Sequence, residues 1–267
     1  MGKIKIMGVL NLTPDSFYDG DSKILQDKSH LELKFKKLIE ADIIDVGCES
    51  SRPGSVPVSQ EEEIERLSCM IDLLKQKKNV LSIDTYKHNV AEYALKHGFS
   101  MINDIYAATY ENNKMFEIAA KYNVPIILMH MKGTPLDMQK KIHYNSLIDD
   151  ILFFFEERIK VADTYGISSD NIILDPGIGF GKSYEDNFKI IKNIDKFKRL
   201  GHKVLIGLSR KSFLNQNAGS PKGRLSATIA MNTISAINGA DILRVHDIKE
   251  CVETIAVLEK YFNSYKN

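Results

Sequence analysis

The feature that most constrains the fold of this chain is an alternation of two kinds of segment. Short apolar runs recur eight times along its 267 residues, and segments with the period of amphipathic helices lie between them. Such continuous runs are typical of parallel strands covered on both faces. Eight strand–helix units in this length predict an α/β fold, a (β/α)8 TIM barrel that forms a single domain over residues 1–267. The runs are IKIMGVLN, IIDVG, VLSID, SMINDI, PIILMH, NIILD, KVLIGLS and DILRVH.

The segments between the runs carry helix signals. The clearest is residues 59–77, where Ser59 and Glu62 have the spacing of a capping box. Its apolar face comprises Ile64, Leu67, Ile71 and Leu74. Further helices are expected over residues 29–41, 87–98, 146–166 and 224–240. Four glycines stand where a left-handed helix cap would need them: Gly98, Gly166, Gly201 and Gly239. A doubly wound open sheet shares this alternation and is the alternative fold.

The composition narrows the classes of partner. Lys and Arg number 36 and Asp and Glu 35, so the formal net charge is +1, and neither a nucleic-acid nor a membrane partner is expected. No apolar run approaches the roughly 20 residues of a membrane helix. The first residues do not have the pattern of a signal peptide. The three cysteines, Cys48, Cys69 and Cys251, lie far apart in the sequence. This pattern favours a reducing compartment and a cytoplasmic location.

One stretch, LDPGIGFGKS at residues 174–183, ends like a nucleotide phosphate loop. A Walker loop needs glycine five places before Gly181, and this chain has Pro176 there, which has no N–H to donate. The spacing of its glycines also fails the dinucleotide pattern G-x-G-x-x-G. We therefore reject a nucleotide loop, and Asp175, which closes an apolar run, becomes the residue to explain.

Polar residues close or follow every apolar run. In a barrel these ends meet at one face, where they can surround one ligand. Carboxylates can accept paired N–H bonds from an amidine-like edge, carboxamides donate and accept, and the cations suit a phosphate or pyrophosphate. The pattern predicts a ligand with a nitrogen heterocycle at one end and an anion at the other. The set is Asn11, Glu49, Arg52, Asp84, Asn103, Asp104, His130, Asp175, Ser209, Arg210, Lys211, Arg244 and His246.

Two long loops and the question of a metal complete the pattern. Residues 11–21 and 49–59 are rich in Gly, Pro and Ser, and we expect them to close over the ligand. Metal-hydrolase barrels open with H-x-H after the first strand, a motif that this chain lacks. His130 is therefore expected to be structural rather than a ligand. A Mg²⁺ bound by the Asn11 amide oxygen, phosphate oxygens and water is the more plausible ion.

These segments resemble the dihydropteroate synthases over essentially the whole chain. The matches are GVLNLTPDSFYDG, IDVGCESSRPGS, SIDTYK, MINDI, MHMKGTP, LDPGIGFGK, GLSRKSF and ILRVHDIKE, one at each strand end. The resemblance implies that (7,8-dihydropterin-6-yl)methyl diphosphate and 4-aminobenzoate condense to 7,8-dihydropteroate and pyrophosphate, a step of folate synthesis, on a homodimer. Two positions depart from the family pattern, Ser51 in place of Thr and Cys48 in place of Gly.

The resemblance also implies roles for residues. The catalytic set would be Asp19, Lys211 and Arg52. The pterin would be bound by Asp84, Asn103, Asp175, Lys211 and Phe180. The residues around 4-aminobenzoate would be Phe17, Ser51, Pro53, Phe180, Lys211 and Ser212. Pyrophosphate would be bound by Arg52, Arg244 and His246, and Mg²⁺ by Asn11.

Three other functions compete with this interpretation. A pterin-dependent methyltransferase barrel would share the pterin pocket but has no need of the R-K-S-F and S-R-P-G segments. A non-catalytic pterin-binding protein would have no need of the anion and lid residues. A Schiff-base aldolase would need a lysine with a lowered pKa, and Lys211 has Arg and Ser neighbours in sequence rather than apolar ones.

Overall fold

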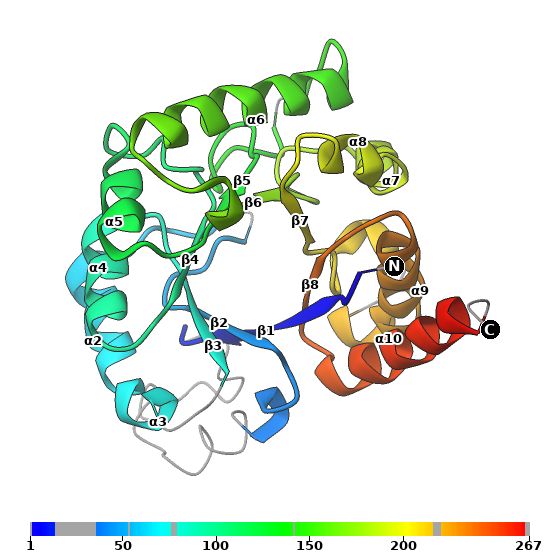
Figure 1. The fold of residues 1–267 in the computed structure, drawn as a ribbon, viewed down its shortest axis with the longest axis horizontal. Coiled ribbons are helices and arrows are strands. Elements are labelled where there is room, and N and C mark those ends of the chain that lie inside the picture. The colour runs from blue at the N-terminus through cyan, green and yellow to red at the C-terminus, as the bar shows by residue number, and fades with distance from the viewer. Residues whose placement is uncertain are drawn as a thin grey trace.

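The computed structural model describes residues 2–13, 36–52, 54–75, 79–140, 142–215 and 220–264. Eight parallel strands close into a barrel in chain order, and helices surround it (Figure 1). Closure confirms the TIM barrel and rules out the open sheet. Each strand lies within one of the eight apolar runs: β1 (Lys5–Asn11), β2 (Ile43–Gly47), β3 (Val80–Asp84), β4 (Met101–Asp104), β5 (Ile126–Met129), β6 (Ile172–Asp175), β7 (Lys203–Ile206) and β8 (Ile242–Val245).

The helices confirm most of the sequence signals. The predicted helices over 87–98, 146–166 and 224–240 are present, and that over 29–41 lies outside the described residues except at its end. The four predicted cap glycines have φ of +97°, +74°, +85° and +106°. The helices are α2 (Gln60–Ser68), α3 (Ile71–Lys75), α4 (His88–Lys96), α5 (Lys114–Tyr122), α6 (Leu147–Thr164), α7 (Tyr184–Lys192), α8 (Ile194–Lys198), α9 (Leu225–Ile237) and α10 (Ile248–Asn263), with short 3₁₀ turns η3 (Ser169–Asn171), η4 (Ser212–Leu214) and η5 (Pro221–Arg224).

The segment predicted as one helix over residues 59–77 is two helices, α2 and α3. The Ser59 hydroxyl accepts from the backbone N–H of Glu62 at 3.1 Å, but the Glu62 carboxylate turns to Arg66, so half of the expected capping box forms. At Met70 the chain tightens, because its N–H donates to the carbonyl three residues earlier at 3.0 Å. This turn ends α2 and brings the Met70 side chain into the core.

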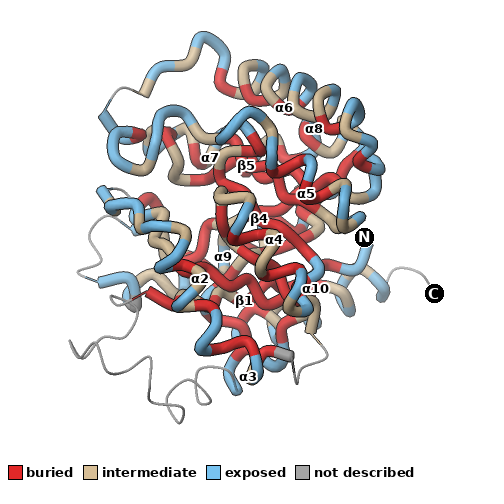
Figure 2. Tube along the Cα trace, turned by 90° about the vertical axis from the view of Figure 1, so that its left-hand side faces the viewer, coloured by how far each residue is buried: buried red, intermediate tan, exposed pale blue. Residues whose placement is uncertain are grey.

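The barrel interior changes from apolar to polar along the strands. Its floor is a cluster of buried side chains from seven strands: Met7, Ile43, Met101, Ile127, Ile173, Leu205 and Ile242. Towards the carboxyl ends, the register places Asn11, Gly47 and Asp84 side by side on β1, β2 and β3. A larger apolar core fills the space between strands and helices, seen as the buried band in Figure 2. The polar strand ends therefore meet at one mouth above an apolar floor.

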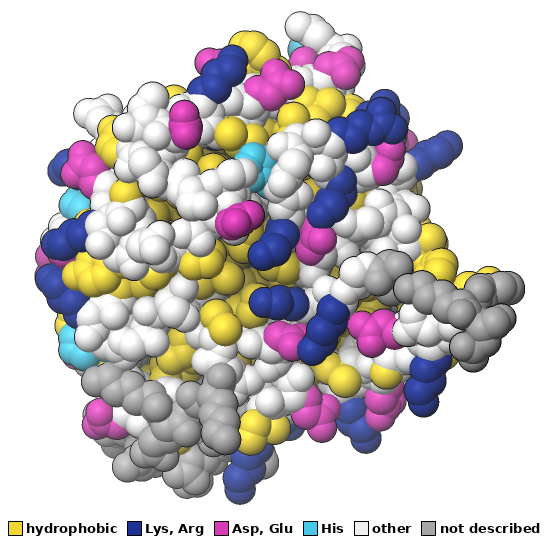
Figure 3. All heavy atoms as spheres, in the orientation of Figure 1, with side chains coloured by type: hydrophobic (Ala, Val, Ile, Leu, Met, Phe, Trp, Pro, Cys, Tyr) yellow, Lys and Arg dark blue, Asp and Glu magenta, His cyan; other side chains and the backbone are white. Residues whose placement is uncertain are grey.

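The outer surface carries no strong bias in charge on the face shown in Figure 3, where basic and acidic side chains are interspersed. Among the described residues no helix is both long and apolar enough to cross a membrane. The three cysteines are free thiols, with Cys48 and Cys251 buried. Burial raises the pKa of Cys48, and its backbone does not adopt a positive φ, so this departure from the family pattern imposes no strain on the strand end.

Candidate functional site

The centre of the mouth is an ion-pair network that joins four strands. Arg244 of β8 donates from Nε to Asp45 of β2 and from Nη2 to Asp84 of β3, each at 2.6 Å. The amide of Asn103, on β4, donates to the same Asp45 oxygen at 3.0 Å. The structure thus brings three predicted residues together, with Arg244 beside the Asp84 carboxylate. Sequence reasoning missed Asp45, although an acid inside the apolar run IIDVG was a signal for it.

Burial makes this network sensitive to protons. Desolvation raises the pKa of Asp84 to about 7, with the Arg244 guanidinium opposing the shift and the Asp45 charge adding to it. Asp45 is fully buried, and its Oδ1 has no hydrogen-bond partner within the described structure. One cation between two carboxylates leaves acceptor capacity free at the centre of the mouth.

Asp175, the last residue of β6, and Lys211, on the loop that follows β7, form a second group at the mouth. Asp175 is 7% exposed and accepts the backbone N–H of Gly177 at 2.8 Å; burial raises its pKa, and Lys211 opposes that rise. The Lys211 ammonium donates to the Ile178 carbonyl and lies 4.6 Å from the centre of the Phe180 ring. These contacts place three predicted pterin-binding residues in one group.

The pKa expectation for Lys211 was wrong. Desolvation lowers the pKa of this lysine to about 8, with Asp175 opposing the change. The cover comes from the β6 loop rather than from sequence neighbours. At Gly179, an added Cβ would lie 3.1 Å from Lys211 Cδ, so the loop packs directly on the lysine stem. The lowered pKa leaves the ammonium largely protonated at neutral pH.

His246 marks a cationic end of the mouth. The backbone N–H of His246 donates to the Ser209 hydroxyl at 3.2 Å, and the ring Nδ1 lies 3.1 Å from the same oxygen. Desolvation, and then the positive charges of Arg244, Arg210 and Arg52, lower the pKa of His246 to about 4. The imidazole is neutral there because burial, and then the neighbouring cations, disfavour its charged form. Arg52, Arg244 and His246 are the three residues predicted to bind pyrophosphate, and the charges of the two arginines lower the pKa of the histidine.

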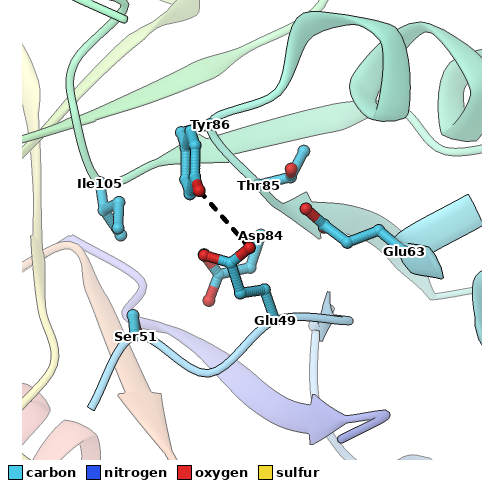
Figure 4. A pocket seen from close by; sticks show the side chains of 7 residues that line it. All are labelled: Glu49, Ser51, Glu63, Asp84, Thr85, Tyr86 and Ile105. Atoms are coloured by element: carbon cyan, nitrogen blue, oxygen red, sulfur yellow. Dashed lines mark hydrogen bonds between the residues drawn. The ribbon is translucent and has the colours of Figure 1, made fainter. Parts of the chain in front are cut away.

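A hollow beside Asp84 lies under the loop that follows β2. In Figure 4 the Tyr86 hydroxyl is directed at Glu49. The seven residues that line the hollow are Glu49, Ser51, Glu63, Asp84, Thr85, Tyr86 and Ile105. Glu49 Oε2 accepts from Lys87 Nζ at 2.5 Å and from the Val58 N–H at 3.0 Å. Lys87 also pairs with Glu63, which is fully buried and whose pKa burial raises. Sequence reasoning did not single out this Glu49–Lys87–Glu63 network.

Asn11 fits a magnesium ligand better than it fits a closed metal site. Its Oδ1 lies 3.4 Å from where a Cβ at Gly47 would be, so the glycine leaves the oxygen accessible at the mouth. The described residues contain no group of three or more His, Cys, Asp or Glu side chains that could hold a metal. One amide oxygen suits Mg²⁺, which usually keeps water and substrate oxygens as its other ligands.

Some strand-end residues serve the fold instead. Arg210 forms a two-pronged ion pair with Asp247. Asp104 accepts the N–H groups of Tyr106 and Ala108, each at 2.8 Å, and so shapes its own loop. His130 packs edge-on against a Phe ring at 4.9 Å, and burial lowers its pKa to about 2, which fits the structural role predicted for it.

The remaining predicted residues differ in what the structure describes. Ser51 is half-buried in the hollow, and Arg52 and Ser212 are exposed at the mouth side. Phe17, Asp19 and Pro53, with most of the first lid loop, lie outside the described residues.

Comparisons with known proteins identify the family of this chain. A model of the family described as Pterin binding enzyme matches residues 7–246. A dihydropteroate synthase of Clostridium beijerinckii is 43% identical over 250 residues, which cover 92% of this chain and 89% of that protein. The structure of dihydropteroate synthase from Clostridium difficile in the presence of pteroic acid has a TM-score of 0.88 and 37% identity, covering 97% of both chains. That of the Xanthomonas albilineans synthase with 4-aminobenzoic acid has a TM-score of 0.87 and 34% identity, covering 97% of this chain and 93% of the other.

Proposed function

This chain belongs to the pterin binding enzymes and, within them, to the dihydropteroate synthases, and we propose how its own residues carry out that reaction. It is a transferase of folate biosynthesis that joins a pterinylmethyl group to 4-aminobenzoate. The observation that carries our assignment of roles is the division of one barrel mouth into a buried acceptor group around Asp175 and Asp84 and a cationic end around His246.

The pterin occupies the acceptor group. Asp175 accepts the amino and ring N–H groups of the pterin, and the Lys211 ammonium, held over the Phe180 ring, donates to its acceptor atoms. Asn103 and Asp84 bind the opposite edge of the heterocycle. For this, Asp84 has to be ionised, because a protonated carboxyl would present a donor to an N–H. The Arg244 contact supports that ionisation.

The diphosphate occupies the cationic end, where Arg52, Arg244 and His246 bind its oxygens. The residues present also fit Mg²⁺, with Asn11 as its protein ligand. The ion, when bound, neutralises charge that builds up on the departing diphosphate. Because a neutral imidazole keeps an N–H to donate, His246 contributes a hydrogen bond rather than a charge.

The reaction breaks the bond between the methylene carbon and the diphosphate oxygen and forms a carbon–nitrogen bond to 4-aminobenzoate. The diphosphate leaves first, which gives a pterin-methyl cation, and the arylamine nitrogen then attacks and releases a proton. The chain stabilises charge at both ends: the cations bind the leaving group, while Asp19, which lies outside the described residues, is assigned to the developing positive charge by the family resemblance alone. No side chain has to act as a general base for the weakly basic amine.

The 4-aminobenzoate is assigned to the outer part of the mouth, beside the loops after β2 and β7. The described residues assigned to it are Ser51, Phe180, Lys211 and Ser212; the family resemblance alone adds Phe17 and Pro53. We also propose that the protein works as a cytoplasmic homodimer. Support for a dimer comes from exposed apolar side chains on the adjacent helices α9 and α10: Ile234, Ile237, Val257 and Tyr261.

A direct assay tests the reaction. The protein is incubated with the pterin diphosphate, 4-aminobenzoate and Mg²⁺, and the dihydropteroate and pyrophosphate formed are measured. The two products should appear in equal amounts. Omitting 4-aminobenzoate should prevent pteroate formation, and EDTA should slow it. Corrinoid-dependent methyl transfer in place of pteroate formation would contradict the assignment.

A further inference from the structure

The loop that follows β6, residues 176–183, has its backbone carbonyls bound by side chains. The five consecutive carbonyl oxygens from Gly177 to Gly181 each accept a hydrogen bond from a side chain. The hydrogen bond to the Gly177 carbonyl is buried, where water cannot take the place of the donor, whereas the bond to the Gly179 carbonyl is at the surface. The donors are Lys182 for the first and fourth oxygens, Lys211 for the second, Gln139 for the third and Tyr144 for the fifth.

Lys182 is the centre of this arrangement. Its ammonium donates to the carbonyl oxygens of Phe180 at 2.8 Å, Gly177 at 3.1 Å and His130 at 3.2 Å. The residue is 3% exposed, so these carbonyls stand in for water. Three donors meet three acceptors, and the His130 carbonyl ties the loop to the end of β5. The lysine that made this stretch resemble a phosphate loop is therefore directed into the protein.

The glycines of the loop allow this close packing. Gly177 has φ of +70°, and a Cβ there would lie 2.0 Å from the His130 carbonyl oxygen. Gly181 has φ of +63°, and a Cβ there would lie 2.5 Å from the Lys132 carbonyl oxygen. The backbone thus adopts a conformation that other residues would strain, and the Lys182 ammonium holds together the carbonyls that this conformation turns inward.

We propose that Lys182 is a positioning residue for both substrates, whose ammonium locks the β6 loop in the shape that presents Asp175 and Phe180. The Gly177 N–H that orients the Asp175 carboxylate is in the same turn as the Gly177 carbonyl that Lys182 binds. The carbonyl of Phe180 is the nearest acceptor to the Lys182 ammonium. The Phe180 ring in turn supports the Lys211 ammonium. The inference rests on the proposed roles of Asp175 and Phe180.

The test replaces Lys182 with Met, which keeps the stem but removes the donors, and with Ala, which leaves space for a small amine. The control is Lys189→Met on α7, an exposed lysine. The KM for 4-aminobenzoate and the affinity for the pterin diphosphate are measured well below each variant's melting temperature. In both Lys182 variants we expect the KM for 4-aminobenzoate to rise, and the affinity for the pterin diphosphate to fall, by about 5- to 100-fold, since buried carbonyls lose their donor. The control should match the parent protein.

Chemical rescue separates positioning from general stabilisation. Propylammonium should restore at least part of the activity of Lys182→Ala, whereas tetramethylammonium, which has no N–H, should not. A lowered melting temperature with unchanged KM and pterin affinity would overturn the inference. If neither variant folds, Gln139→Leu and Tyr144→Phe each remove one side-chain donor to the carbonyls of the same loop. Unchanged KM and pterin affinity in both would overturn the inference.

A further variant distinguishes failure of this inference from failure of the proposed function. Phe180→Ala removes the ring that we assign to 4-aminobenzoate and leaves the Lys182 contacts, which are made to backbone. If Phe180→Ala weakens substrate binding and Lys182→Met does not, the positioning role alone is wrong. If Phe180→Ala changes nothing, the assignment of the ring to the site is wrong.

Discussion

The loops after β6 and β2 both carry residues assigned to the substrates, yet the protein holds them in different ways. The β6 loop is bound along its length, and most of its residues are buried. The loop that follows β2 is held at its root and by one backbone hydrogen bond near its tip. Arg66 binds the Cys48 carbonyl at 2.6 Å, Lys87 binds Glu49, and near the tip the Gly54 N–H donates to the Pro135 carbonyl at 2.9 Å.

The difference indicates a division of labour. A loop whose polar groups are satisfied internally is formed before the ligand arrives. We expect a loop held at few points, with Arg52 exposed, to gain order from the anion that the proposed function assigns to it. We therefore infer that the pterin half of the mouth is preformed and that the half for 4-aminobenzoate and diphosphate is completed by substrate. The predictions below test each half.

The largest effect is expected from Asp175→Asn in the preformed half. The substitution places an amide donor against a pterin N–H and removes the charge that faces the heterocycle. Mismatched buried polar groups cost about 1–3 kcal/mol each, so pterin affinity should fall at least about 100-fold. The fold should persist, because burial already raises the pKa of this carboxyl and the charge does not favour folding. Calorimetry that finds near-normal pterin affinity would refute the role of Asp175.

Ordered binding should follow from the half that substrate completes. Without an anion near Arg52 and His246, 4-aminobenzoate should bind at least about 30-fold more weakly than in the presence of pterin diphosphate or pyrophosphate with Mg²⁺. Titrating 4-aminobenzoate into the free protein and into the pyrophosphate complex measures the ratio. Equal, tight binding in both would show that the β2 loop is as preformed as the β6 loop.

The anchor of the β2 loop can be weakened through Lys87→Met. Lys87 holds Glu49 at the root of the loop and neutralises the buried Glu63, so its loss frees the root and leaves two carboxylates facing each other. We expect the KM for 4-aminobenzoate to rise about 20-fold, with pterin affinity within about twofold of the parent value.

The matched control is Lys96→Met at the end of α4, the helix that Lys87 immediately precedes; Lys96 is exposed and pairs with Glu92. Glu63→Gln, which preserves the size of the side chain and leaves the Lys87–Glu49 pair in place, should have a smaller effect than Lys87→Met. A loss of pterin affinity equal to the rise in KM would mean that the two halves of the mouth are not independent.

Sequence reasoning located the barrel because both of its signals are local. An apolar run of four or five residues and a glycine after a helix report on backbone conformation wherever they occur, and every strand fell within a predicted run. The break at Met70 escaped prediction because the helical period continues through it. That break depends on how deeply one side chain enters the core, which is a property of the packed structure.

The sequence predicted where the site residues lie in the fold better than it predicted which of them contact one another. Strand ends gave Asp84, Asn103 and Asp175, but nothing local shows that Arg244 pairs with two carboxylates that lie about 160 and 200 residues away in sequence. The lowered pKa of Lys211 likewise depends on cover from the β6 loop. Neighbours in sequence, an arginine and a serine, gave the wrong environment for it.

The pH dependence of pterin binding should report on Asp84. Its pKa of about 7 lies above the usual value of 3.8, so the folded protein binds the extra proton, and this group's contribution to stability falls as pH rises from about 4 to about 7. Pterin binding changes in the opposite direction, since it needs the ionised form. Affinity should fall about tenfold between pH 8 and pH 6. The Asp84→Asn variant, although weaker throughout, should lack this dependence once the titration of the pterin itself is subtracted; a retained slope would place the titration elsewhere.

The smallest effect is expected from Ser51→Thr, which restores the usual family residue in the half that substrate completes. Ser51 is half-buried in the hollow beside Asp84, and the substitution keeps its hydroxyl while adding one methyl group. Burying that methyl is worth at most about 1 kcal/mol, or roughly fivefold in affinity, and turnover should change little. If the methyl packs on the aniline ring that 4-aminobenzoate and sulfonamides share, both should bind more tightly. If it crowds the sulfonyl group, the inhibition constant should rise while the KM for 4-aminobenzoate stays the same. Measuring both constants for both proteins decides between these contacts, and a large loss of turnover would show that Ser51 does more in the loop than line the ring.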